Sequence, residues 1–172
     1  AVNGKGEIQV RMDYRPLKDG LQLIQKVGMR MRIPAEYSQV SWYGRGPHEN
    51  YPDRKSGYFI GQYSMPQDEF IFDYASPQDN ANRCDTRWFS LGNGSRDIEI
   101  HGLQELNFRA WPYGEEDLEG SAHPFDIPAR DFINVNIDFK IHGVGGNDGW
   151  GARTMDAYTI DPAQPYSFGF II

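Results

Sequence analysis

One tryptophan of this chain lies where its side chain is free to bind a ligand instead of filling a core. Residues 145–151 read GGNDGWG, and such glycines free the backbone but supply no packing for Trp150. An indole face can stack on the C–H face of a hexose while its N–H donates a hydrogen bond. Trp150 is therefore a candidate sugar-binding residue, with Asn147 and Asp148 beside it. The alternative is an aromatic side chain that folds back onto the domain.

Other residue types suited to chemistry are present without the spacing that chemistry requires. Acids gather between residues 115 and 119, but such a run is far more often a solvated surface than a catalytic pair. The histidines lack metal-ligand spacing such as H-x-x-x-H. Asn147 and Asp148 supply two oxygens, whereas calcium takes about six to eight. We therefore assign no catalytic carboxylate and no metal site.

Composition excludes several classes of partner. The formal charge is −7, from 17 basic and 24 acidic residues, which argues against nucleic acid because phosphate binding needs a basic face. The single cysteine, Cys84, excludes an internal disulfide and a cysteine-rich zinc site. No apolar run of about 18 residues suggests a membrane span, and residues 1–7 lack the features of a signal peptide. Localisation stays open between cytoplasm and periplasm.

Alternating polar and apolar residues, with frequent glycine and proline, predict an all-β sandwich. A short helix at residues 114–119, or an acidic loop there, is the exception, and residues 58–75 are predicted as extended segments and loops. Residues 21–33 form two strands or one long bent strand. The other expected strands are 7–14, 39–43, 87–91, 97–101, 105–111, 134–141 and 166–172.

The clearest alternation, in residues 134–141, predicts one core face and one polar face. The core face carries Val135, Ile137, Phe139 and Ile141, opposite Asn136, Asp138 and Lys140. Trp42 and Trp88 also lie within strand patterns, and we expect both in the core.

Three sequence blocks resemble motifs of the small-chain, or fifth, domain of family 2 β-galactosidases. The first block, residues 42–54, matches W-x-G-x-G-P-x-E-x-Y-x-D-R through Trp42, Gly44, Gly46, Pro47, Glu49, Tyr51, Asp53 and Arg54. The second block, residues 77–88, is similar to P-x-E-N-x-x-R-x-x-x-R-W through Asn80, Arg83, Arg87 and Trp88, with Asp79 replacing the glutamate. The third block, residues 143–150, is similar to G-x-G-G-D-D-x-W through Gly145, Gly146, Asp148 and Trp150, with Asn147 replacing an aspartate.

The resemblance covers the chain from Gly4 to its end and implies an antiparallel super-sandwich of the galactose mutarotase-like type. It implies one domain, residues 1–172, which is the latter part of a longer domain and lacks the catalytic barrel. In this family the catalytic carboxylates and the magnesium ligands lie in that barrel, so none of them maps onto this chain and no cofactor is expected here. The implied partners are the rest of the β-galactosidase chain and a β-galactoside. A homo-oligomeric parent stays open.

The function expected from the resemblance is that of an accessory domain, inactive alone. It would contribute Trp150, with Asp148 and Asn147, to the aglycone side of the active site. The other block residues are expected to brace loops, with Arg83 and Arg87 pairing with acids such as Asp85 or Glu49. Two alternatives are a free-standing carbohydrate-binding module and a mutarotase-like epimerase. The epimerase would need a histidine and a glutamate converging in a concave sheet, a pair that the spacing does not single out.

Overall fold

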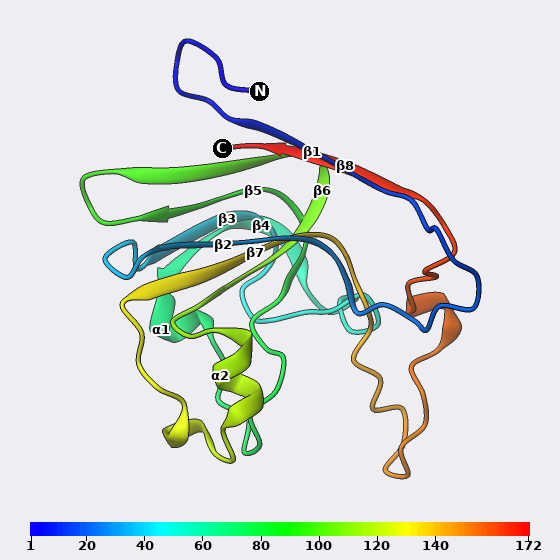
Figure 1. Ribbon diagram of the computed structural model, residues 1–172. Coiled ribbons are helices and arrows are strands. Elements are labelled where there is room, and N and C mark those ends of the chain that lie inside the picture. The colour runs from blue at the N-terminus through cyan, green and yellow to red at the C-terminus, as the bar shows by residue number, and fades with distance from the viewer.

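Antiparallel strands are the main regular elements of the computed structural model, which describes residues 1–172 (Figure 1). Two short α-helices and two 3₁₀ turns lie in the connections, and no helix is long and apolar enough to cross a membrane. The strands are β1 (Gln9–Tyr14), β2 (Lys26–Pro34), β3 (Gln39–Gly46), β4 (Phe59–Pro66), β5 (Arg83–Gly92), β6 (Asp97–Trp111), β7 (Phe132–Ile141) and β8 (Tyr166–Ile171). The helical elements are α1 (Gln67–Phe70), α2 (Glu115–Gly120), η1 (Pro124–Asp126) and η2 (Asp156–Tyr158).

The sheet branches at its longest strand, β6. The main order is β1-β8-β6-β5-β3-β4, while β7 pairs with both β6 and β2. The early part of β6 pairs with β8 at residues 101–102, and its end pairs with β7 at residues 107–111. All strand pairs are antiparallel, which confirms the predicted fold class at this level.

The prediction of two strands at 97–101 and 105–111 was wrong, because β6 runs unbroken through Gly102. Even-numbered residues from Ile98 to Ala110 point inward on both sides of this glycine, and β5 pairs with both halves. A Cβ on Gly102 would lie 2.2 Å from the carbonyl oxygen of Gln104. Gly102 therefore permits a close backbone approach within a strand. In the sequence alone, such a glycine is easily taken for a turn.

Other predicted boundaries also changed. The second predicted strand, residues 21–33, begins only at Lys26 as β2. Residues 58–75 contain a regular strand, β4, and the short helix α1. The strand predicted at 39–43 continues to Gly46 as β3, because Gly44 packs against Thr86 where a Cβ would lie 2.9 Å from the Thr86 Cα. The predicted short helix is confirmed as α2.

Aromatic side chains fill the centre of a core of 21 buried residues. Phe89 and Phe108 stack with ring centroids 4.2 Å apart, and Trp42 packs edge-on against Phe70 at 5.5 Å. Trp42 is completely buried, as predicted, and its indole N–H donates to the carbonyl of Arg45 at 3.0 Å. The hydrogen bond satisfies the one polar group of a buried tryptophan and fixes the start of the first block against the core.

Strand β7 has two buried faces, which corrects the prediction of one core face. Val135, Ile137 and Ile141 are buried as expected, but Asn136 and Asp138 on the other face are only 3% exposed. Asn136 donates to the Glu115 carboxylate of α2 at 2.9 Å, and Asp138 accepts a hydrogen bond from Arg109 at 2.9 Å. The polar face of β7 is therefore covered by a polar layer, because buried polar groups require partners.

Candidate functional site

Trp150 lies in the loop between β7 and η2, which extends away from the sheet (Figure 1). The side chain is 95% exposed and makes no aromatic contact. The alternative that Trp150 folds back onto the domain is therefore wrong for this structure. A solvated indole on an extended loop is free to stack on a ligand.

The tip of the loop is shaped by Asp148. One carboxylate oxygen of Asp148 accepts the backbone N–H groups of Trp150 at 2.8 Å and Ala152 at 3.1 Å. These backbone hydrogen bonds, first that of Trp150, lower the pKa of Asp148 because they favour the charged carboxylate. Asn147 is exposed and makes no hydrogen bond. Asp148 therefore orients the backbone of Trp150, whereas Asn147 is free.

The base of the loop is held by Asp53 of the first block. Its two carboxylate oxygens accept the N–H groups of Val144 at 3.1 Å and Gly145 at 2.8 Å. Gly145 has a φ of +69°, a left-handed conformation that favours glycine. The first and third blocks, far apart in the sequence, thus meet at the base of the loop.

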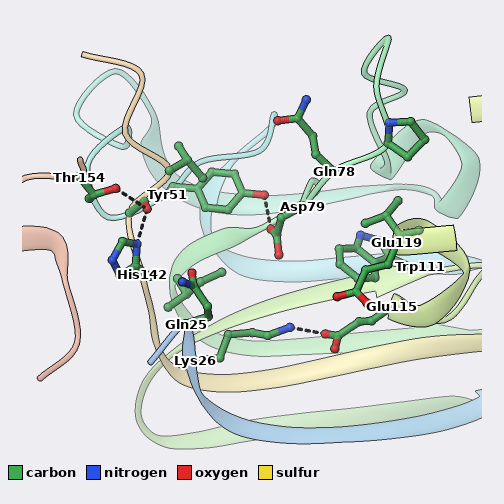
Figure 2. Close-up of a pocket in the computed structure, with 15 residues that line it drawn as sticks. Gln25, Lys26, Tyr51, Gln78, Asp79, Trp111, Glu115, Glu119, His142 and Thr154 are labelled. Carbon is green, nitrogen blue, oxygen red and sulfur yellow. Dashed lines mark hydrogen bonds and ion pairs between the residues drawn. The ribbon is translucent and has the colours of Figure 1, made fainter. Parts of the chain in front are cut away.

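A cleft of about 610 Å³ opens beside the loop base, as Figure 2 shows. Gly143, Val144 and Thr154 form one wall, and α2 contributes Glu115 and Glu119 on the other side. The remaining labelled residues are Gln25, Lys26, Tyr51, Gln78, Asp79, Trp111 and His142. The cleft has the volume of a small-molecule site, and many of its lining residues are polar.

A chain of polar groups, buried at Tyr51 and Arg109 and partly exposed at Asp79, forms the wall of the cleft and joins the first two blocks. The Tyr51 hydroxyl donates to Asp79 at 2.6 Å, and Asp79 pairs with Arg109. Arg109 is fully buried and also pairs with Asp138 at 2.9 Å. Burial, followed by the charge of Asp79, raises the pKa of Tyr51 well above its ordinary value. The Tyr51 phenol therefore keeps its proton and donates it in this hydrogen bond. Asp79, although shorter than a glutamate, still reaches Arg109.

Three of the four acids of α2 are engaged in ion pairs, and Glu119 is exposed without one. Glu115 pairs with Lys26, Glu116 lies 2.7 Å from Arg32, and Asp117 accepts two hydrogen bonds from Arg130. Burial acts to raise the pKa of Glu115, but hydrogen bonds from Lys26 and Asn136 together outweigh it and hold the pKa below its ordinary value. The structure contains no group of three or more His, Cys, Asp or Glu residues that could hold a metal ion. Helix α2 is thus attached by polar contacts to β2 and β7.

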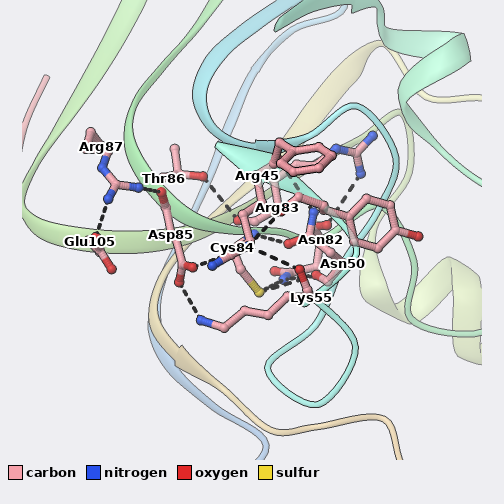
Figure 3. A network of polar contacts seen from close by, with 12 residues as sticks. Arg45, Asn50, Lys55, Asn82, Arg83, Cys84, Asp85, Thr86, Arg87 and Glu105 are labelled. Carbon is pink, nitrogen blue, oxygen red and sulfur yellow. Dashed lines mark hydrogen bonds and ion pairs between the residues drawn. The ribbon is translucent and has the colours of Figure 1, made fainter. Parts of the chain in front are cut away.

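The loops of the first and second blocks are joined by side-chain hydrogen bonds. Glu49 accepts the N–H of Ala81 at 2.7 Å and also binds Arg54 at 2.7 Å. Asn50 accepts the N–H of Cys84 at 2.9 Å, and Asn82 donates to the carbonyl of Asn50 at 2.7 Å (Figure 3). Side chains thus satisfy backbone groups that irregular buried loops leave unpaired.

The prediction that Arg83 pairs with a buried acid was wrong. Arg83 is 2% exposed, donates to backbone carbonyls of Ala81 and Phe70 at 3.0 and 3.3 Å, and makes no ion pair. Its guanidinium carbon lies 4.1 Å from the Phe70 ring centroid. Burial lowers its pKa to about 10. Carbonyl dipoles and aromatic faces replace the expected carboxylate.

Asp85, Arg87 and Trp88 complete the second block. Asp85 pairs with Arg45 at 2.5 Å and Lys55 at 2.6 Å (Figure 3). The predicted pairing of Arg87 with Asp85 or Glu49 was also wrong, because Arg87 pairs with the exposed Glu105 at 2.5 Å and reaches only the backbone carbonyl of Asp85. Trp88 is only partly buried, which corrects its predicted place in the core, because it lies on the outer face of β5 beside His101. Arg109 and Asp138 were missed as site residues, since no block contains them.

Comparison with known proteins identifies the family. A family model described as the β-galactosidase small chain matches residues 1–172. The chain belongs to this family. A β-galactosidase of Priestia megaterium is 34% identical over 168 residues, which are 97% of this chain and 16% of that protein. One of Lactobacillus delbrueckii subsp. bulgaricus is 30% identical over 173 residues, 99% of this chain and 17% of that protein.

The chain thus spans about a sixth of the length of these relatives. Membership of the small-chain family confirms the resemblance drawn from the three blocks. The contacts of Asp53, Glu49, Tyr51 and Asp79 show that these blocks meet in space. The substrate-binding roles of Trp150, Asp148 and Asn147 stay predictions.

Arg83 and Arg87 offer a matched pair of variants. Arg83→Ala removes buried hydrogen bonds and leaves a cavity, so we expect a loss of about 3 kcal/mol in unfolding free energy. Arg87→Ala breaks a surface pair, and we expect a loss of less than about 1 kcal/mol. Denaturant unfolding of both variants measures the difference, and equal losses would contradict burial as its cause.

Asp85 makes stability depend on pH. Burial acts to raise its pKa, but hydrogen bonds from Lys55 and Arg45 outweigh burial and hold the pKa below its ordinary value. The stabilisation is therefore present above an unfolded-state pKa of about 4 and is lost as the pH falls through the folded-state value. Asp85→Asn keeps a side chain that tolerates its φ of 52° and removes the charge.

We expect the unfolding free energy of the wild type to fall more steeply below about pH 4 than that of Asp85→Asn. Asp19→Asn is the control, because Asp19 is exposed and makes no ion pair. Parallel pH profiles of the wild type and Asp85→Asn would refute the assignment.

Proposed function

We propose that this chain is the accessory C-terminal part of a β-galactosidase that hydrolyses terminal β-D-galactosides, and that Trp150 contacts the aglycone sugar. The family and the names of the relatives support the enzyme class. The 95% exposure of Trp150 on an oriented loop carries the proposal for the contact. Asp148 holds the backbone beneath the indole, and Asn147 offers a free amide to a sugar hydroxyl.

Within this proposal, the chain supplies no catalytic group. A retaining glycosidase needs two carboxyl groups about 5–5.5 Å apart across a sugar pocket. Glu115, Glu116 and Asp117 of α2 pair with Lys26, Arg32 and Arg130, and Asp79 pairs with Arg109. Glu119 is left as a single exposed carboxylate. The catalytic carboxylates and any magnesium ion then belong to the rest of the enzyme. The branched antiparallel sheet supports a super-sandwich of the mutarotase-like type.

The chain alone should fold but should not hydrolyse a β-galactoside, because the carboxylate pair is absent. The measurement is hydrolysis of nitrophenyl β-galactoside by the purified chain, with circular dichroism to establish β structure. Only a sample whose circular dichroism shows folded β structure is assayed, so that inactivity is not the result of misfolding. Turnover that copurifies with the folded chain would overturn this part of the proposal.

Trp150→Ala in the whole enzyme should weaken aglycone binding. A stacking face is worth roughly 0.5–1.5 kcal/mol beyond its buried area, and the upper part of that range is about tenfold in affinity. If the face holds the aglycone equally in ground and transition states, the loss appears as a higher KM for lactose. Inhibition by galactose, which reports the inner subsite, should change little.

Two control variants accompany this experiment: one keeps an aromatic ring at position 150, and the other removes an exposed aromatic ring elsewhere. Trp150→Phe retains an aromatic face and should retain most of the affinity. Phe125→Ala removes another aromatic side chain, 83% exposed on η1, and should leave KM unchanged. If galactose and a glucose-like acceptor lose equal affinity in Trp150→Ala, or neither does, Trp150 is not an aglycone platform.

A further inference from the structure

We propose that Asp53 is a positioning residue for the loop that carries Trp150, an inference that rests on the proposed function. Residues 143–152 bond mostly among themselves and with residues just after them. Gly143 donates to the carbonyl of Tyr158 at 2.8 Å, and the Thr154 hydroxyl donates to the carbonyl of Gly143 at 3.2 Å. These contacts close the loop on itself and leave its direction relative to the sheet unset.

Asp53 supplies that direction. It is the one residue outside the segment 142–159 whose atoms hydrogen-bond to residues 143–156. Each of its carboxylate oxygens takes one N–H, from Val144 and from Gly145, so the two bonds fix an orientation that a single bond would leave free to rotate. Bonds to a charged acceptor are also stronger than those between neutral groups.

Gly143 makes room for this contact. A Cβ at position 143 would lie 2.7 Å from the carboxyl carbon of Asp53 and 2.9 Å from the Cβ of Tyr158. Any other residue would therefore push the carboxylate away from the loop. The glycine that opens the third block and the aspartate near the end of the first block fit each other sterically.

Asp53 itself sits in a turn closed by backbone hydrogen bonds. Tyr51 and Arg54 pair across the turn, and the N–H of Arg54 donates to the carbonyl of Tyr51 at 2.8 Å. Tyr51 is 1% exposed and bonds Asp79, while Arg54 binds Glu49. The turn that directs the Trp150 loop is thereby tied through Asp79 to the buried Arg109.

The test uses the whole enzyme with Asp53→Asn, Trp150→Ala and the double variant. An asparagine offers one oxygen, so one of the two N–H groups loses its acceptor; a lost hydrogen bond of about 1 kcal/mol corresponds to about a fivefold higher KM for lactose. Inhibition by galactose should not change. In the Trp150→Ala background, Asp53→Asn should add nothing, because both act through one side chain. Asp156→Asn, at an exposed carboxylate without hydrogen bonds, is the matched control.

Hydrogen exchange of residues 143–152, followed by mass spectrometry, gives a readout independent of activity. Exchange should be faster in Asp53→Asn and in Gly143→Ala, and unchanged in Asp156→Asn. If Trp150→Ala raises KM but Asp53→Asn changes neither KM nor exchange, the inference is overturned and the proposed function stands. If the two effects multiply in the double variant, Asp53 acts elsewhere and the inference also fails.

If Trp150→Ala leaves KM unchanged, the proposed function fails instead. Exchange then decides the inference alone: faster exchange in Asp53→Asn supports Asp53 as the residue that positions the loop, and unchanged exchange overturns it.

Discussion

Arg109 is a fully buried cation, and a buried charge costs several kcal/mol unless partners surround it. Asp79, from the loop before β5, and Asp138, on β7, supply that compensation. Burial acts to lower the pKa of Arg109, but the charges of these two carboxylates outweigh it and raise the pKa, so the guanidinium stays charged. One side chain of β6 thus fixes a neighbouring strand and a loop, and the cleft wall and the polar face of β7 both depend on it.

The first block connects that centre to the surface. Tyr51 binds Asp79, Glu49 binds the N–H of Ala81, and Asp53 binds the third block. These side chains reach different segments because the turn that carries them is irregular and buried, and its neighbours need partners for their backbone groups. The motif residues that look chemically reactive in the sequence therefore act mainly as hydrogen-bonding braces.

Periodicity predicted most strands and the short helix, but it failed where burial was two-sided. Asn136 and Asp138 were assigned to an exposed face because polar residues alternating with apolar ones indicate a half-buried strand. A polar layer covers them instead, and its members, Arg109 and Glu115, lie on other elements. Likewise, Arg83 found carbonyls and rings in place of an acid. Such partners depend on register and packing between distant segments, which periodicity does not encode. Trp150 was predicted correctly to be unpacked because loop composition is a local property.

The exposure of Trp150 has meaning only if its position is defined, and glycines alone define none. Two carboxylates compensate for the backbone freedom of the loop: Asp148 binds N–H groups at the tip, and Asp53 binds them at the base. Because these bonds are directional and charge-assisted, they can hold a backbone that has no core to pack against. The base bond leads through the turn at Tyr51 to Asp79 and Arg109. An exposed indole is thus placed by a buried cation, through polar contacts that cross all three sequence blocks.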